Sequence, residues 1–165
     1  MYIYSCIFSG DEFFSDVYPN SVLEDVLFAV EAKYVTKEEG GSFGIEGDDV
    51  DEATNSVKVL NIADASDLME TQIDKKGYIA HIKKYMRSVK EKLTAKGTPQ
   101  AELDVFQAGA AKVVKDLILP NFNQLQFWVG KSCEADGMIA ISKWSEDGSS
   151  CVFWFWKHGL IGNKV

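Results

Sequence analysis

Residues 74–119 read DKKGYIAHIKKYMRSVKEKLTAKGTPQAELDVFQAGAAKVVKDLIL. The segment holds ten basic and five acidic residues, so its net charge is about +5, whereas the whole chain of 165 residues carries −8. The remainder of the chain therefore carries about −13. The segment also has the strongest helical periodicity in the chain. A basic helical element within an acidic, strand-rich body indicates a surface that binds partners.

The apolar residues of this segment predict two helices. A first apolar stripe predicts a helix over residues 74–95, with Asp74 as its N-cap. The sequence Lys-Gly-Thr-Pro at residues 96–99 should end this helix and begin the next, with Thr98 as the second N-cap. A second stripe runs over residues 103–118 and is followed by a proline that should end the helix. The short connection predicts an antiparallel helical hairpin whose two stripes pack on each other.

Strand patterns occupy the chain on both sides of the hairpin. Apolar and β-branched runs predict strands at residues 2–7, 26–36, 57–62, 125–129, 138–144 and 151–156. The last of these runs has no polar position, so we expect it to be covered on both faces. Length and element order predict a single domain over residues 1–165. Its class is α+β, mainly β, with the hairpin inserted between two halves of one β body.

Residues 38–56 form an acidic segment with seven acidic residues, no basic residue and four glycines. Low hydrophobicity and like charge cannot offset the entropy of ordering, so the segment is predicted to be a mobile loop. Carboxylates could hold a hard cation, but the acids lack the order of an EF-hand. The alternative is a solvated loop that binds Ca²⁺ only weakly and nonspecifically. The candidate calcium ligands are Asp48, Asp49, Asp51 and Glu52.

Composition and motifs argue against several classes of function. The acidic balance disfavours nucleic-acid binding, and no apolar stretch approaches the length of a membrane span. His81 and His158 lack metal-ligand spacing, and no nucleophile or phosphate-binding signature occurs. The N-terminus does not resemble a signal peptide, and three scattered cysteines predict free, mostly buried thiols. We therefore expect a cytosolic, monomeric protein that is not an enzyme and has no cofactor apart from weakly bound Ca²⁺.

Two further surface features are candidate partner-binding sites. Basic side chains of the first helix lie off its apolar stripe and could bind an acidic protein; the alternative is an ordinary solvated helix face. These are Lys83, Lys84, Arg87 and Lys90. Acids beside Phe13 and Phe14 could be presented by a turn that the two rings anchor; the alternative is a hydrophobic plug with ordinary surface acids. These are Asp11, Glu12 and Asp16.

Several motifs together resemble the translationally controlled tumor protein (TCTP) family. The opening Met1-Tyr2-Ile3-Tyr4 and the later Asp11–Tyr18 segment resemble the start of the family's sequences. The helical segment at residues 78–93 resembles its central helix. Further along the chain, the matching motifs are Asn121-Phe122, Gln126–Gly130, Asp136–Ala140 and Lys157-His158-Gly159-Leu160. The likeness extends from one end of the chain to the other.

The resemblance implies a fold of several small, twisted β-sheets, called a β-tent, with a projecting helical hairpin and a flexible acidic loop. This fold is similar to that of a chaperone of Rab small GTPases. The family's implied roles are growth control, cell survival (anti-apoptotic activity) and Ca²⁺ binding. Its implied partners are tubulin, small GTPases and translation elongation factors.

An alternative role implied by the resemblance is that of a guanine-nucleotide exchange factor or nucleotide-free chaperone for a small GTPase. In this role Glu12 would contact the GTPase. The chain departs from the family pattern at Lys131, where the family usually has Glu, and at Asn123, where it often has Lys.

Overall fold

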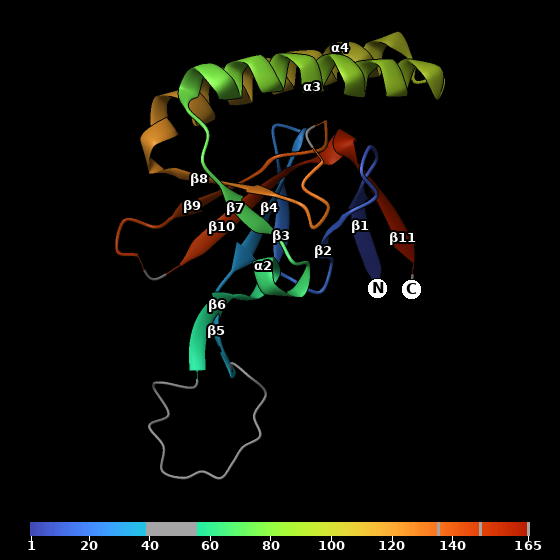
Figure 1. Cartoon of the computed structure of the whole chain (residues 1–165). Helices are drawn as coiled ribbons and strands as arrows, with labels where there is room; N and C mark the ends of the chain where they lie inside the picture. The colour runs from blue at the N-terminus through green and yellow to red at the C-terminus, as the bar shows by residue number, and fades with distance from the viewer. Residues whose placement is uncertain (39–55, 135, 149, 165) are drawn as a thin grey trace, which may run out of the picture.

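The β body carries the helical hairpin along one side (Figure 1). The computed structural model describes residues 1–38, 56–134, 136–148 and 150–164. The chain is α+β and mainly β, as predicted, and the described strands form three sheets. The helical hairpin joins two strands of the largest sheet, which agrees with the predicted insertion.

The largest sheet has six antiparallel strands with a central apolar strand. Its order is β3 (Asn20–Leu23), β4 (Leu27–Ala32), β10 (Cys151–Trp156), β9 (Ala140–Trp144), β8 (Leu125–Val129) and β7 (Met69–Thr71). Strand β10 pairs with β4 on one side and β9 on the other. All of its residues except the half-buried Val152 are buried. The prediction that this strand is covered on both faces is confirmed.

Two smaller sheets complete the body. One consists of β11 (Leu160–Lys164), β1 (Tyr2–Cys6) and β2 (Glu12–Ser15), and the other of β5 (Tyr34–Glu38) and β6 (Ser56–Leu60). Because β1 pairs with β11, the first and last strands lie side by side (Figure 1). This division into several sheets matches the β-tent that the resemblance implies.

The predicted strand over residues 57–62 extends too far. Strand β6 ends at Leu60, and the short helix α2 (Asn61–Ala65) begins at the next residue. The Asn61 side-chain oxygen accepts hydrogen bonds from the backbone N–H groups of Ile62 (2.8 Å) and Lys33 (3.1 Å). A side chain that bonds the backbone in this way competes with the strand ladder and favours a turn into a helix.

Other differences from the predicted strands arise where burial and strand pairing do not coincide. Met138 and Ile139 are buried, but β9 begins only at Ala140. Their apolar character therefore reflects the core and not a strand. The short strands β3, β7 and β11 were not predicted separately, because three to five mostly exposed residues carry no clear alternation.

The helical hairpin begins as predicted. Helix α3 (Lys75–Ala95) has Asp74 as its N-cap, and the Asp74 carboxylate accepts a hydrogen bond of 2.7 Å from the Gly77 N–H. Gly97 has a φ of 90°, the left-handed conformation that glycine adopts at low cost after a helix.

The start of the second helix differs from the prediction by one residue. Helix α4 (Gln100–Val113) has Pro99 as its N-cap, not Thr98. The Thr98 N–H instead donates to the Leu93 carbonyl at 3.0 Å, and the Gly97 N–H donates to the Thr94 carbonyl at 3.0 Å. These two bonds form a Schellman motif, so Thr98 closes α3 and does not open α4.

The end of the hairpin also differs. Helix α4 passes into a π-helical turn, η1 (Val114–Ile118), and then a 3₁₀ segment, η2 (Leu119–Gln124). Pro120 lies in the first turn of η2, where its missing N–H costs no helical hydrogen bond. The proline therefore begins this last segment and does not end the preceding helix.

The apolar stripes of the hairpin face the β body as well as each other. The Tyr78 ring lies 5.1 Å from that of Phe127 on β8, between ring centroids, and the Tyr85 ring lies 5.6 Å from that of Phe8. On α4, the Phe106 ring lies 4.7 Å from the His158 imidazole. The predicted packing of stripe on stripe is therefore incomplete, because the sheet beneath the hairpin takes much of the apolar surface.

We predict that Phe106→Ala lowers the free energy of unfolding by about 3–5 kcal/mol, because the side chain is 1% exposed and its removal leaves a cavity between hairpin and body. Urea denaturation followed by tryptophan fluorescence measures the change. The neighbouring substitution Val105→Ala is the control. Its side chain is 54% exposed, so the change should stay within about 0.5 kcal/mol. Equal effects of the two substitutions would contradict the packing described here.

Candidate functional site

The described residues contain no group of three or more His, Cys, Asp or Glu side chains that could hold a metal ion. The candidate calcium ligands Asp48, Asp49, Asp51 and Glu52 lie outside the described residues. Within the part of the chain that the structure describes, no helix is long and apolar enough to cross a membrane.

The three cysteines are free, and their positions differ from one another. Cys6 and Cys151 are buried, as predicted, but Cys133 is exposed and its sulfur lies 3.5 Å from that of Met69. Burial raises the pKa of the Cys151 thiol to about 11, so this thiol remains protonated at neutral pH.

Two of the three acids in the predicted acidic turn, Asp11 and Asp16, accept hydrogen bonds from other segments of the chain. Asp11 Oδ2 accepts hydrogen bonds from the Ser132 hydroxyl at 2.7 Å and the Ser132 N–H at 3.1 Å. A Cβ at Gly130 would lie 2.5 Å from Asp11 Oδ2, so this contact requires glycine there. Asp16 Oδ1 accepts from the Tyr2 N–H at 3.1 Å. Both carboxylates therefore join segments of the β body.

Glu12, the third acid, is exposed at the start of β2. Asp16 is exposed too, but its carboxylate accepts a hydrogen bond from the Tyr2 N–H. Phe13 and Phe14 follow Glu12 and are buried, at 1% and 2% exposure, which confirms that the rings anchor this segment. The Phe14 ring stacks on that of Phe155 at 4.8 Å between centroids. The Glu12 carboxylate thus projects from a backbone that the core holds in place.

The four basic residues predicted on one face of α3 lie in two different surroundings. Lys84 forms an ion pair with Asp136 at 3.1 Å and so joins the hairpin to the loop before β9. Lys83, Arg87 and Lys90 lie instead along a groove between the two helices. The sequence missed Lys115 on η1, which lines the same groove. The sequence shows that Lys115 is basic, but it does not show that this residue lies beside the first helix, because that depends on how the two helices pack.

This hairpin groove has an apolar floor and a basic rim. Its volume is about 580 Å³, and Ile82, Phe106 and Ala110 in its floor are buried. Of the described residues that line it, none is acidic. Its lining residues are Ile79, Ile82, Lys83, Met86, Arg87, Lys90, Phe106, Gln107, Ala110, Ala111, Val114, Lys115 and Leu119.

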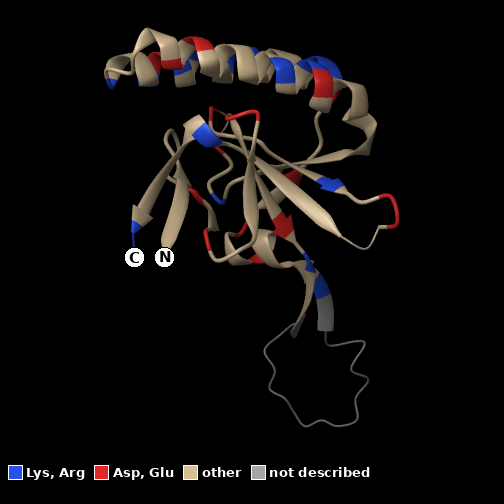
Figure 2. Ribbon diagram, turned by 180° about the vertical axis from the view of Figure 1, so that it is seen from behind, with Lys and Arg blue, Asp and Glu red and all other residues tan. Residues whose placement is uncertain are grey.

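Buried titratable groups on the hairpin and beneath it add no charge at neutral pH. Burial lowers the pKa of His81, an effect that Asp136 partly opposes, and burial lowers the pKa of His158. Burial raises the pKa of Tyr78 and Tyr85. The charge of the hairpin therefore comes from its Lys, Arg, Asp and Glu residues, which recur along both helices in Figure 2.

The comparisons with known proteins agree with this architecture along the whole chain. Residues 1–161 match the family described as translationally controlled tumour protein. Curated relatives include the translationally-controlled tumor protein homologs of Gibberella zeae, 36% identical over 174 residues, and Saccharomyces cerevisiae, 33% identical over 170 residues; each alignment covers 100% of both chains.

Solved structures are similar as well. The translationally controlled tumor-associated protein of Schizosaccharomyces pombe is 30% identical, with a TM-score of 0.83 over 100% of both chains. The TCTP structure from Caenorhabditis elegans is 26% identical, with a TM-score of 0.72 over 100% of this chain and 99% of that one.

Fold and surface together define a mainly β protein that presents a helical hairpin with a charged groove. The full-length matches identify its family. The chain belongs to the translationally controlled tumour protein family.

We predict that Asp11→Ala lowers the free energy of unfolding by about 1–2 kcal/mol, because two hydrogen bonds to a charged acceptor are lost at a partly exposed site. Glu12→Ala, at the next residue, should change it by less than about 0.5 kcal/mol, since this side chain is exposed. Urea denaturation of the two variants measures the difference. The reverse order would show that Glu12, and not Asp11, supports the fold.

Proposed function

We propose that this protein is a non-enzymatic regulator that acts by binding other proteins, and that its hairpin groove receives an acidic amphipathic helix of a partner. The observation that carries the proposal is the combination of a buried apolar floor with a rim of four cations. Apolar side chains on one face of a partner helix would occupy the floor, as in other helix-in-groove complexes. Carboxylates beside that face would meet the rim.

The groove favours an acidic partner over a neutral one for an electrostatic reason. Lys83, Arg87, Lys90 and Lys115 are spread over both sides of the groove, and no acidic side chain among the described lining residues offsets their charge. Their potentials add, which speeds association with an acidic surface and disfavours a basic one. The overall net charge of −8 would repel the same acidic partner elsewhere, so binding should be confined to the hairpin.

Within this proposal, the partners are those that family membership suggests. Tubulin is acidic and fits the groove by charge, and translation elongation factors and small GTPases are further protein partners. The setting is the cytoplasm, and the cellular roles are growth control and cell survival. Weak binding of Ca²⁺ by the acidic segment belongs to the same proposal.

We predict that the triple variant Lys83→Glu, Arg87→Glu, Lys90→Glu binds purified tubulin at least about tenfold more weakly, because attraction at the groove becomes repulsion. Lys84 is left unchanged because it pairs with Asp136. Fluorescence anisotropy of the labelled protein at increasing tubulin concentration measures affinity. Binding by the unchanged protein should also weaken as salt is added.

The matched control reverses three other exposed lysines of the hairpin, Lys75, Lys76 and Lys96, which do not line the groove. It makes the same change in net charge. The proposal expects the control to retain most of its affinity. Equal weakening by the two triple variants would assign binding to the overall charge of the hairpin and overturn the role of the groove.

A second candidate function rests on Glu12. We propose that this exposed carboxylate, held by the buried Phe13 and Phe14, contacts the nucleotide site of a small GTPase and favours nucleotide release. A carboxylate on a fixed backbone loses little entropy when it forms a contact, which favours its use at an interface. The protein would then act as an exchange factor or as a chaperone of the nucleotide-free state.

We predict that the protein accelerates release of a fluorescent guanine nucleotide from a purified small GTPase, and that Glu12→Gln removes most of this acceleration. The control is Glu31→Gln, an equal charge change at an exposed residue of β4. Absence of acceleration by the unchanged protein, or full acceleration by Glu12→Gln, would refute the exchange role. Complexes without faster release would leave the binding function as the explanation.

A further inference from the structure

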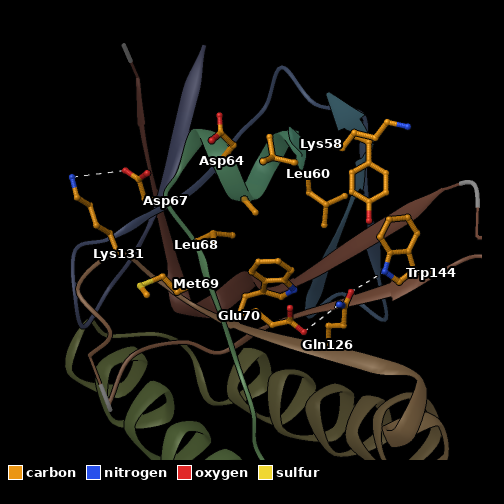
Figure 3. Close-up of a pocket in the computed structure, with 14 residues that line it drawn as sticks. Lys58, Leu60, Asp64, Asp67, Leu68, Met69, Glu70, Gln126, Lys131 and Trp144 are labelled. Atoms are coloured by element: carbon orange, nitrogen blue, oxygen red, sulfur yellow. Dashed lines mark hydrogen bonds and ion pairs between the residues drawn. The ribbon is translucent and has the colours of Figure 1, made fainter. Parts of the chain in front are cut away.

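A second hollow lies on the side of the six-stranded sheet that faces away from the hairpin (Figure 3). Its volume is about 570 Å³, within the size range of small-molecule sites. It is lined by the pair β5–β6, by α2 and by β7, β8 and β9. None of the candidate residues from the sequence lies in it apart from Lys131, which marks a departure from the family pattern.

Aromatic rings form one wall of this pocket. The Tyr34 and Trp144 rings stack at 5.2 Å between centroids, and Trp128 lies nearby in the same pocket. Both indole N–H groups are already used: Trp144 Nε1 donates to Gln126 Oε1 at 2.8 Å, and Trp128 Nε1 donates to Ser142 Oγ at 2.9 Å. These bonds fix the orientation of the two indoles. Because Tyr34 already covers one face of Trp144, what remains for a ligand is the electron-rich ring surface that lines the pocket.

A carboxylate lies against the same wall. Gln126 Nε2 donates to Glu70 Oε2 at 3.2 Å, so the amide that positions Trp144 also positions Glu70 (Figure 3). Glu70 lies on β7 and its side chain is exposed. A carboxylate held beside indole faces is suited to a planar cation that stacks and donates hydrogen bonds at once.

The remaining charges of the pocket also favour a cation. Lys131 lies 3.9 Å from Asp67, and both side chains are largely exposed. Asp64 and Glu70 line the pocket together with one further cation, Lys58, at its rim. The charged residues that line the pocket therefore sum to −1 at neutral pH. An anionic ligand would meet this net negative charge and the negative faces of the rings.

We propose that this pocket binds the guanidinium group of an arginine side chain in a partner polypeptide. Arginine is favoured over lysine because its guanidinium is planar, stacks on indole faces and donates two parallel hydrogen bonds to one carboxylate. Glu70 accepts these bonds, and Trp128 and Trp144 supply the stacking surface. The site is independent of the hairpin groove and of Glu12, so its failure would leave both proposed functions untouched.

The test is an NMR titration of the ¹⁵N-labelled full chain with the blocked tripeptide Gly-Arg-Gly. The indole N–H signals of Trp128 and Trp144 should shift with saturation, with an affinity on the order of millimolar for so small a ligand. The isosteric peptide Gly-citrulline-Gly, which lacks the charge, should bind at least about fivefold more weakly. Equal binding of the two peptides would overturn the proposal.

Two further ligands identify the source of the cation. Free arginine should cause the same shifts as Gly-Arg-Gly but bind no more tightly, because a partner polypeptide supplies the side chain without a free carboxylate. A trimethyl-lysine peptide tests the competing aromatic-cage chemistry. Tighter binding of that peptide than of Gly-Arg-Gly would replace arginine by methylated lysine and refute the assignment.

Glu70→Gln keeps the size of the side chain and an oxygen that accepts from Gln126, so the fold should be retained. It should weaken Gly-Arg-Gly binding at least about fivefold through loss of the charge-assisted bonds. Glu91→Gln, at an exposed residue of α3, makes the same charge change outside the pocket and should leave affinity unchanged. If Glu70→Gln binds Gly-Arg-Gly with unchanged affinity, the Glu70 carboxylate does not contact the ligand and the proposal is overturned.

Discussion

The central strand β10 sets the main constraint on this structure, because its apolar side chains must be removed from water on both faces of the sheet. On one face, Phe155 packs against Phe13 and Phe14 of β2, at 5.7 Å and 4.8 Å between ring centroids. On the other face, the Trp156 indole lies beside the Tyr78 hydroxyl of α3. A single sheet exposed to water would leave one of these faces uncovered. The hairpin and the three-stranded sheet of β11, β1 and β2 are therefore both needed to cover one strand.

This two-sided cover determines which surfaces remain available to partners. Tyr78, Tyr85 and Phe106 of the hairpin pack against the β body. The groove between the two helices keeps a basic rim. On the other side of the sheet, β5–β6 and α2 do not close completely over Trp128 and Trp144, which leaves the aromatic pocket. The two surfaces lie on opposite sides of the sheet and differ in charge. Partners of opposite charge could therefore bind without competing for one site.

Sequence patterns predicted the elements whose side chains repeat over a long segment. The stripe of α3, its cap at Asp74 and the apolar strand β10 were all read correctly, because each depends on local periodicity or on one residue's bond to its neighbour. Prediction failed where a distant segment supplies the partner. Asn61 ends β6 because its side chain accepts from the N–H of Lys33, which lies between β4 and β5. Thr98 is a different case: two local arrangements competed for it, and its N–H bonds the Leu93 carbonyl at the end of α3.

For the candidate sites, the sequence by itself determined residue chemistry: an acidic chain with a basic hairpin, a carboxylate beside two phenylalanines and a family-wide pattern of motifs. Only the tertiary structure decided which charges act together. It paired Lys84 with Asp136, joined Asp11 to Ser132, and brought Lys115 beside Lys83, Arg87 and Lys90 along the hairpin groove. It also assembled the aromatic pocket from β5, β7 and the consecutive strands β8 and β9, which come from three separate parts of the chain. The physical reason is that charge and hydrogen bonding act over a few ångströms in space, whereas sequence spacing fixes distance only within one helix or strand.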